Sequence, residues 1–97
     1  MIEIYTNSGR FYSQKDESIF FDWIQKIEGV DSVVGAGREL RISLNENVSD
    51  AAVRDLICAL MRFDMDMKGI GEIQRHTERF EWINDPNKFW FERAYSY

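Results

Sequence analysis

Apolar residues recur at helical spacing in two stretches of the chain. Between residues 16 and 27 they lie three or four positions apart, the first turn carries Asp16 and Glu17, and Gly29 follows as a stop signal. A second stretch follows Ser49 and Asp50, either of which can cap a helix. We therefore predict two amphipathic helices, each with one apolar face for the core. Their apolar residues are Ile19, Phe20, Trp23, Ile24 and Ile27 in the first, and Val53, Leu56, Ile57, Leu60 and Met61 in the second.

Alternating apolar and polar residues predict strands elsewhere. A valine-rich segment from residue 30 to 34 leads through the turn-forming residues Gly35-Ala36-Gly37 into a segment, 39 to 44, in which every second residue is apolar. We expect these two segments to pair as a hairpin. Ile2 and Ile4 predict a first strand or short hairpin, which would include Phe11 and Tyr12 and would be interrupted by a turn at Thr6-Asn7-Ser8-Gly9. The predicted class is α+β, with a small antiparallel sheet of about three strands and two main helices packed on one face.

The helical pattern changes after the second predicted helix. Met65 and Met67 alternate with aspartates, and Gly69 and Gly71 each weaken a continuing helix by about 1 kcal/mol relative to alanine. We expect a break near residues 64 to 67 and a short helix around Ile70 and Ile73.

Aromatic residues are concentrated at the carboxyl end. Seven of the fourteen lie in the last eighteen residues, and a segment this rich in bulky apolar surface is expected to dock on the body of the protein or on a partner. Asp85-Pro86 predicts a helix start, although a strand remains an alternative. Phe89, Trp90 and Phe91 are consecutive and would spread over about 200° of a helix, so at least one ring should face something other than the main core.

Length and composition predict one domain spanning residues 1–97. The chain has 97 residues, 44% of them hydrophobic, which suffices for one self-standing core. No apolar stretch approaches the ~18 to 20 residues that span a bilayer, and the first residues lack the pattern of a secretory signal. A single cysteine, Cys58, forms no internal disulfide. We expect a cytoplasmic protein that does not bind membranes.

The formal net charge of -5 disfavours binding to nucleic acids, whose phosphates repel an acidic chain. The same charge favours encounter with a basic protein, and proteins that cut or bind nucleic acids are commonly basic. Solubility alone is the simpler explanation of the excess acids.

Catalytic, cofactor and metal motifs are not evident in the sequence. His76 and Cys58 are the only residues of their types, they lie far apart in sequence, and Cys58 is expected to be a small buried residue on the second helix. Asp64-Met65-Asp66 lacks the glycine and glutamate of a calcium loop, and Gly35-Ala36-Gly37 lacks the third glycine of a phosphate-binding loop. We expect no catalytic residues, no cofactor and no metal; an enzyme would need a pocket where His76 or two carboxylates converge.

Two segments carry a family resemblance, RFDMDMKGI at 62 to 70 and WINDPNKFWFERAY at 82 to 95. Together they resemble the small immunity proteins of bacterial contact-dependent growth inhibition and polymorphic-toxin systems. Those families show an arginine-aromatic-x-apolar-Asp-apolar-Lys segment and end in a Trp-aromatic-x-Asp-Pro-x-x-aromatic-Trp-aromatic block. The departures here are Ile83 in place of an aromatic residue, and Gly69 and Gly71 in a stretch that is usually helical. The matching residues are Arg62, Phe63, Met65, Asp66, Met67 and Lys68, then Trp82, Asp85, Pro86, Phe89, Trp90, Phe91 and Tyr95.

The resemblance implies a non-enzymatic antidote in the cytoplasm of the toxin-producing cell. Its partner would be a cognate toxin domain, and the expected type of toxin is a basic nuclease. The antidote would block the active site or the substrate surface of that toxin. The expected contact surface comprises Glu72, Arg75, Glu78, Glu81, Trp82 and Asp85. The acids Asp31, Glu39 and Glu46 form a competing patch, and a small module that forms a homodimer through the aromatic tail is the alternative function.

Overall fold

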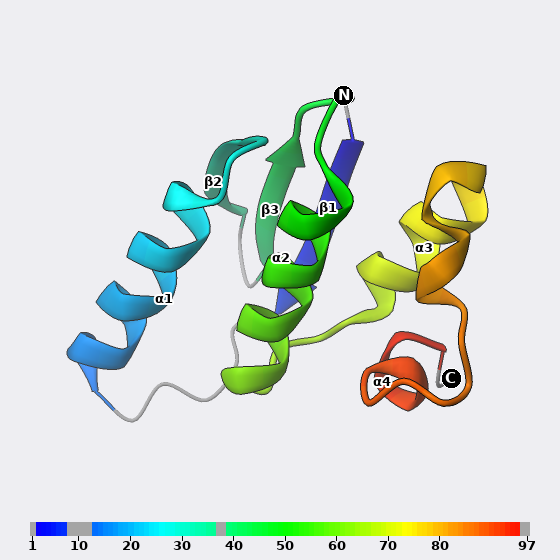
Figure 1. The fold of residues 1–97 in the computed structure, drawn as a ribbon. Coiled ribbons are helices and arrows are strands. Elements are labelled where there is room, and N and C mark those ends of the chain that lie inside the picture. Colours follow the sequence, from blue (N-terminus) through cyan, green and yellow to red (C-terminus); the bar gives the residue numbers. More distant parts are fainter. Residues whose placement is uncertain (1, 8–12, 37–38, 96–97) are drawn as a thin grey trace.

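The computed structural model describes residues 2–7, 13–36 and 39–95 and has the α+β architecture predicted from the sequence (Figure 1). Phe11 and Tyr12 lie outside the described residues, as does the side chain of His76. The elements in chain order are β1 (Ile2–Asn7), α1 (Gln14–Lys26), β2 (Val30–Ala36), β3 (Glu39–Leu44), α2 (Asp50–Arg62), α3 (Lys68–His76), the 3-10 helix η1 (Glu78–Ile83) and α4 (Phe91–Tyr95).

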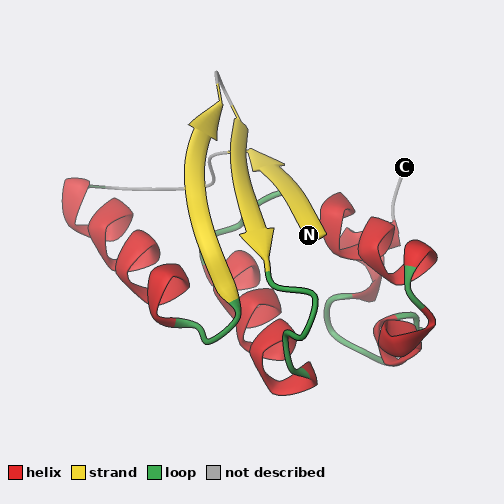
Figure 2. Ribbon diagram, turned by 90° about the horizontal axis from the view of Figure 1, so that it is seen from above, coloured by secondary structure: helices red, strands yellow, loops and turns green. Residues whose placement is uncertain are grey.

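The three strands form one antiparallel sheet in the order β1-β3-β2, so β3 is central. Ile42 of β3 pairs with Ile4 on one side and Val33 on the other, and these side chains point toward the core. The opposite face is open, since Tyr5 and Val34 expose 46% and 42% of their surface there. Figure 2 shows α1 and α2 on the same side of the sheet, which confirms the predicted packing.

Serine hydroxyls start both main helices. Ser13 accepts a hydrogen bond from the Asp16 amide, and Ser49 accepts one from the Ala52 amide, so Ser49 is the cap of α2. Each helix then turns most of its apolar stripe inward, although Ile19, predicted to belong to the core face of α1, exposes 53% of its surface. The fully buried residues of that interface include Phe20 and Ile24 of α1, and Val53, Leu56, Ile57 and Leu60 of α2.

The expectation that Cys58 is buried is wrong. Cys58 is exposed, on the side of α2 that also carries Arg54 and Arg62 one turn away in each direction. At 100° per residue, position 58 falls outside the stripe made by Val53, Leu56, Ile57 and Leu60. The apolar neighbours of Cys58 in sequence therefore do not share its side of the helix.

The predicted turn at Thr6-Asn7 is also wrong, because both residues belong to β1. Thr6 is buried, and its hydroxyl donates a 2.7 Å hydrogen bond to the carbonyl oxygen of Asp66. A polar residue with turn propensity is stable in this strand because the segment before α3 supplies an acceptor. Ser8 and Gly9 lie outside the described residues.

The predicted break and short third helix are confirmed. The chain leaves α2 through Asp64, whose φ is +56°, and α3 then begins at Lys68. The two glycines of α3 lie against other backbone: a Cβ at Gly69 would be 3.1 Å from the Tyr5 carbonyl oxygen, and one at Gly71 would collide with the Ala94 carbonyl oxygen. α3 therefore covers the outer edge of β1 on one side and contacts α4 on another.

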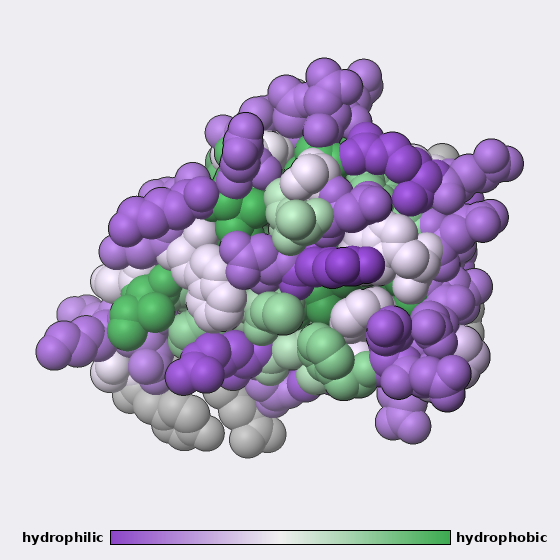
Figure 3. Space-filling model, in the orientation of Figure 1, coloured by the Kyte–Doolittle hydropathy of each residue, from purple (hydrophilic) through white to green (hydrophobic). Residues whose placement is uncertain are grey.

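The aromatic tail is docked on the body of the protein. Trp90 and Ala94 are buried within the main core, and α4 packs against α3 (Figure 1). The surface of the face with α1 and α2 is mostly hydrophilic, with hydrophobic side chains scattered among the polar ones (Figure 3).

Candidate partner-binding surface

A chain of four aromatic rings connects the core to solvent in the C-terminal segment. Phe80, Trp82, Trp90 and Phe89 follow one another with ring centroids 6.4, 6.0 and 5.0 Å apart, each pair nearly perpendicular. Phe80 and Trp90 are buried and Trp82 is half-buried, whereas Phe89 exposes 61% of its surface. The prediction that one of the consecutive rings faces away from the core is confirmed, and that ring is Phe89.

A turn, and not a helix, begins at Asp85-Pro86. The Asp85 carboxylate accepts a 3.0 Å hydrogen bond from the Asn87 amide, and its carbonyl oxygen accepts one from the Lys88 amide. The predicted helix start there is therefore wrong, and α4 begins only at Phe91. The delay has a tertiary cause, because the indole N–H of Trp90 donates a 2.8 Å hydrogen bond back to the Ile83 carbonyl oxygen. This bond and the burial of Trp90 hold the segment between Ile83 and Trp90 folded back on itself.

The arginines around this segment lie over the protein's own aromatic rings. The guanidinium carbons of Arg54, Arg75 and Arg79 are 4.9, 5.6 and 4.7 Å from the ring centroids of Trp82, Tyr95 and Phe80, respectively. Arg79 also donates a hydrogen bond to the Glu46 carbonyl oxygen, at 2.7 Å. These three cations are therefore held at the molecular surface over aromatic rings.

Arg93 pairs with an acid. It forms an ion pair with Asp64 and donates a second hydrogen bond to the Met65 carbonyl oxygen. By contrast, Glu72, Glu78 and Glu81 are exposed and make no ion pair within the part of the chain that the structure describes. The carboxylates of α3 and η1 are therefore available to a charged partner.

The six residues expected at the contact surface fall into two groups, which lie on different elements. Glu78, Glu81 and Trp82 lie together in η1, with Asp85 in the turn after it. Glu72 and Arg75 lie on α3; Glu72 lines a small hollow with the end of β1, and Arg75 lies over Tyr95.

Trp82 differs from the exposed acids of η1. It is half-buried under Arg54, and its indole N–H has no acceptor among the described residues. Sequence reasoning omitted Arg54 and Phe89 from this surface. The three consecutive rings signalled that one would be exposed but not which one.

The acids of the competing patch are separated. Asp31 is near the start of β2, beside Ser43 and Leu44, whereas Glu39 begins β3. The length of β3 places them about 15 Å apart. Glu46 lies in the turn before α2. Asp31 and Glu46 therefore lie toward the same end of β3, whereas Glu39 is at its other end, so the three acids form no single cluster.

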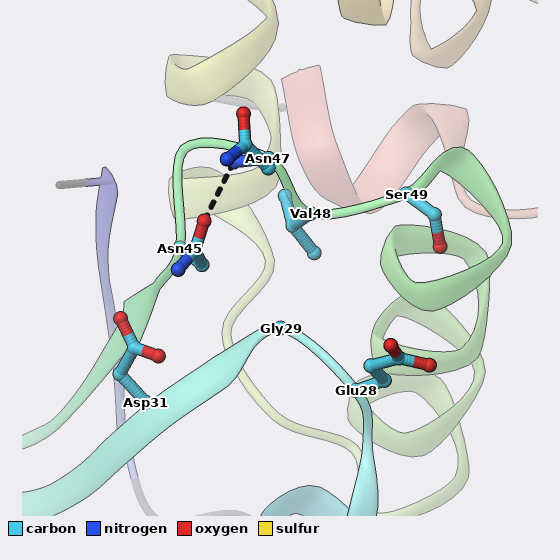
Figure 4. Close-up of a pocket in the computed structure, with 7 residues that line it drawn as sticks. All are labelled: Glu28, Gly29, Asp31, Asn45, Asn47, Val48 and Ser49. Atoms are coloured by element: carbon cyan, nitrogen blue, oxygen red, sulfur yellow. Dashed lines mark hydrogen bonds between the residues drawn. The ribbon is translucent and has the colours of Figure 1, made fainter.

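A polar hollow lies between the turn after α1 and the loop before α2 (Figure 4). Glu28 and Asp31, its two carboxylates, lie on opposite sides of Gly29 in Figure 4 and do not face one another as a catalytic pair would. The other polar groups make local bonds: the Asn45 side chain accepts from the Asn47 amide at 2.8 Å, and Ser49 caps α2. The hollow is lined by Glu28, Gly29, Asp31, Asn45, Asn47, Val48 and Ser49.

Within residues 2–7, 13–36 and 39–95, no three His, Cys, Asp or Glu side chains are grouped to hold a metal ion. None of the helices in those ranges is both long and apolar enough to cross a bilayer. Comparison of the chain with protein-family models, with curated proteins and with solved structures finds no match.

Proposed function

We propose that this protein is an immunity protein, a non-enzymatic cytoplasmic antidote that binds and neutralises a toxin domain, with a basic nuclease as the type of toxin. The observation that carries the proposal is that one segment, residues 78 to 89, carries both an exposed aromatic side chain and exposed, unpaired carboxylates. Phe89 supplies the ring, and Glu78 and Glu81 supply the charges. Aromatic anchors and charges complementary to those of the partner are typical of protein-binding surfaces.

The aromatic anchor is preorganised for binding. Phe89 packs edge-on against Trp90 at 5.0 Å, and Trp90 is itself buried and hydrogen-bonded to the Ile83 carbonyl oxygen. A ring held in this way loses little conformational freedom on binding, so more of the contact energy contributes to affinity. Insertion of Phe89 into an apolar pocket of the partner would slow dissociation, which an antidote to a lethal enzyme needs.

The carboxylates supply attraction and a means of inhibition. Nucleases bind phosphates with lysine and arginine side chains, so exposed acids on an inhibitor can occupy the positions where phosphates would lie. The net charge of -5 attracts such a basic surface from a distance and raises the association rate at low ionic strength. The proposed inhibitor therefore covers the substrate surface of the toxin and takes no part in its chemistry.

The proposal is tested by titrating the protein with the toxin domain encoded by the neighbouring gene. We expect a one-to-one complex of nanomolar affinity and loss of nuclease activity at stoichiometric inhibitor. Replacing Phe89 with alanine should weaken the complex at least about tenfold. Ile19→Ala is the matched control, because Ile19 is similarly exposed, at 53%, but lies on α1. Absence of a complex at micromolar concentration would refute the proposal.

A charge-reversal pair separates the two acidic regions. Glu78→Lys with Glu81→Lys should slow association about tenfold at low salt and reduce its dependence on ionic strength. Glu28→Lys with Asp31→Lys makes the same change in net charge, but beside β2. This second pair should slow association only through the change in net charge, and therefore less than the first pair does. If only the second pair slows association, the contact lies at the sheet end. If Phe89→Ala instead abolishes a dimer of the protein alone, the tail is a self-association module.

A further inference from the structure

The two edges of the sheet differ in how the chain covers them. The outer edge of β1 is closed by the segment that leads into α3, through the bond from Thr6 to Asp66 and the close approach of Gly69 to Tyr5. Within residues 2–7, 13–36 and 39–95, no segment covers the outer edge of β2 in this way. Among the described residues, the backbone from Ser32 to Ala36 pairs only with β3. An uncovered strand edge is a template for another strand.

β2 also lacks most features that discourage pairing. Its sequence, VDSVVGA, contains no lysine and no proline, and its register irregularity, together with its only charge, is confined to the start of the strand. The stretch from Ser32 to Ala36 is uncharged, and Val34 exposes 42% of its surface. Nothing in that stretch would repel an uncharged strand.

Gly35 provides an independent sign that another backbone approaches β2. Its φ is not positive, and a Cβ built on it meets nothing within 4 Å, so the fold of this chain does not require glycine there. Glycine weakens a strand and, where it is found inside one, commonly marks a bulge, a bend or close approach of a second backbone. The irregularity of β2 lies at Val30–Ser32, so Gly35 is not part of that bulge, and the open space beside Gly35 leaves room for a second backbone.

The outer side of α1 continues the same surface. Phe20 and Ile24 are buried and mark the inward side of α1, whereas the exposed residues Ser18, Asp22 and Gln25 lie about 100° or more around the helix from them. A shallow hollow there is lined by partly buried Phe21 and five polar residues, Gln14, Glu17, Ser18, Asp22 and Gln25. In Figures 1 and 2, α1 and β2 lie at the same end of the molecule, away from α4.

We propose that two copies of this chain associate about a two-fold axis, with β2 pairing antiparallel to β2 of the second copy and the outer sides of α1 meeting beneath. Residues directly opposite in a sheet point to the same face, and Val34 is on the open face beside Arg41. If the two-fold axis passes beside Val34, at the centre of the uncharged stretch, Val34 lies opposite Val34 of the second copy and Val33 lies opposite its Gly35. The five-residue neutral stretch from Ser32 to Ala36 is thus paired with itself, which makes a second copy the fitting occupant.

Charge and area set the expected strength of this dimer. In that register Asp31 of one copy lies beyond the paired stretch of the other, so the nearest acids of the two strands are about 20 Å apart and largely screened at physiological ionic strength. Pairing of β2 alone would bury less surface than a standard interface, which buries about 800 Å² per partner. Contact between the two α1 helices would add to the buried area. We expect micromolar association that strengthens with salt, because Glu17 and Asp22 line the helix contact.

Sedimentation of the isolated protein from micromolar to submillimolar concentration tests the proposal. The mass should rise toward two chains, and Val34→Glu should weaken association at least about tenfold by placing two carboxylates opposite one another. Tyr5→Glu is the matched control, with the same charge change, the same open face and a similar exposure of 46%, but on the covered strand. Tyr5→Glu should leave the dimer unchanged.

Hydrogen exchange keeps the proposal testable if Val34→Glu fails to fold. In the unaltered protein, the amides of β2 should exchange more slowly as concentration rises, whereas those of β1 should not change. A protein that stays monomeric throughout, or a dimer that survives Val34→Glu in a folded variant, would overturn the proposal. So would a dimer lost on Phe89→Ala, because that result would place the contact at the tail.

Discussion

Replacing Gly71 with alanine improves the local helix propensity but disturbs a tertiary contact. In an ordinary helix this change stabilises the folded protein by about 1 kcal/mol. Here the new Cβ would collide with the Ala94 carbonyl oxygen, which is backbone and cannot swing away as a side chain would. Ala94 is buried, and its amide is bonded to the Trp90 carbonyl oxygen, so α4 would have to move as a unit.

The collision should outweigh the helix preference. Overpacking costs about 1 to 3 kcal/mol, and a backbone obstacle places Gly71→Ala at the upper end. Subtracting the gain of about 1 kcal/mol leaves a net destabilisation of about 2 kcal/mol, which lowers the melting temperature of a domain this size by about 8 °C or more. Urea unfolding followed by circular dichroism gives the free energy, and thermal unfolding gives the melting temperature.

Gly35 and Gly69 supply the comparison. Gly35→Ala should be neutral or slightly stabilising, because its Cβ meets nothing within 4 Å. Gly69→Ala should fall between the two, since its closest obstacle is the Ile4 side chain, at 2.6 Å, which can shift partly. If Gly71→Ala is as stable as the unaltered protein or more so, the packing of α4 on α3 described above is refuted.

Three substitutions probe other contacts of the fold. Thr6→Val should cost about 1 to 2 kcal/mol, because it keeps the shape but leaves the Asp66 carbonyl oxygen without its donor; equal urea midpoints would contradict this. Ser49→Ala should cost about 1 kcal/mol by removing the cap of α2, again measured by urea unfolding. Trp90→Phe should cost about 2 kcal/mol or more through the lost bond to Ile83 and the lost volume, and an unchanged melting temperature would show that the indole is not held as described.

The two main helices could be predicted from the sequence because their apolar spacing is strongly periodic. Residues whose conformation depends on a partner distant in sequence could not. The spacing of Phe20 and Ile24, and of Leu56 and Leu60, determines one buried side of each main helix whatever else surrounds it. Thr6 was misassigned because its acceptor, Asp66, is sixty residues away in the chain. Turn propensity describes only local alternatives and carries no information about such a partner.

The same distinction explains the errors in the tail and on α2. Asp85-Pro86 has the local chemistry of a helix start, but the bond from Trp90 to Ile83 favours a turn. Cys58 has apolar neighbours in sequence, yet its angular position on the helix leaves it exposed. On the candidate surface, the acids could be chosen from the sequence, whereas the exposure of Phe89 depends on which of three adjacent rings enters the core.

The closure of the β1 edge by the segment around Asp66 and Gly69 has a consequence for synthesis on the ribosome. β1 leaves the exit tunnel before its partner β3, and the other side of β1 is covered only after α2 has also emerged. During that interval nascent β1 presents bare amides and carbonyls to its surroundings. Emergence of Gly69 from the tunnel is thus the step that removes this hazard, so a ribosome that stalls before it leaves a product prone to aggregate.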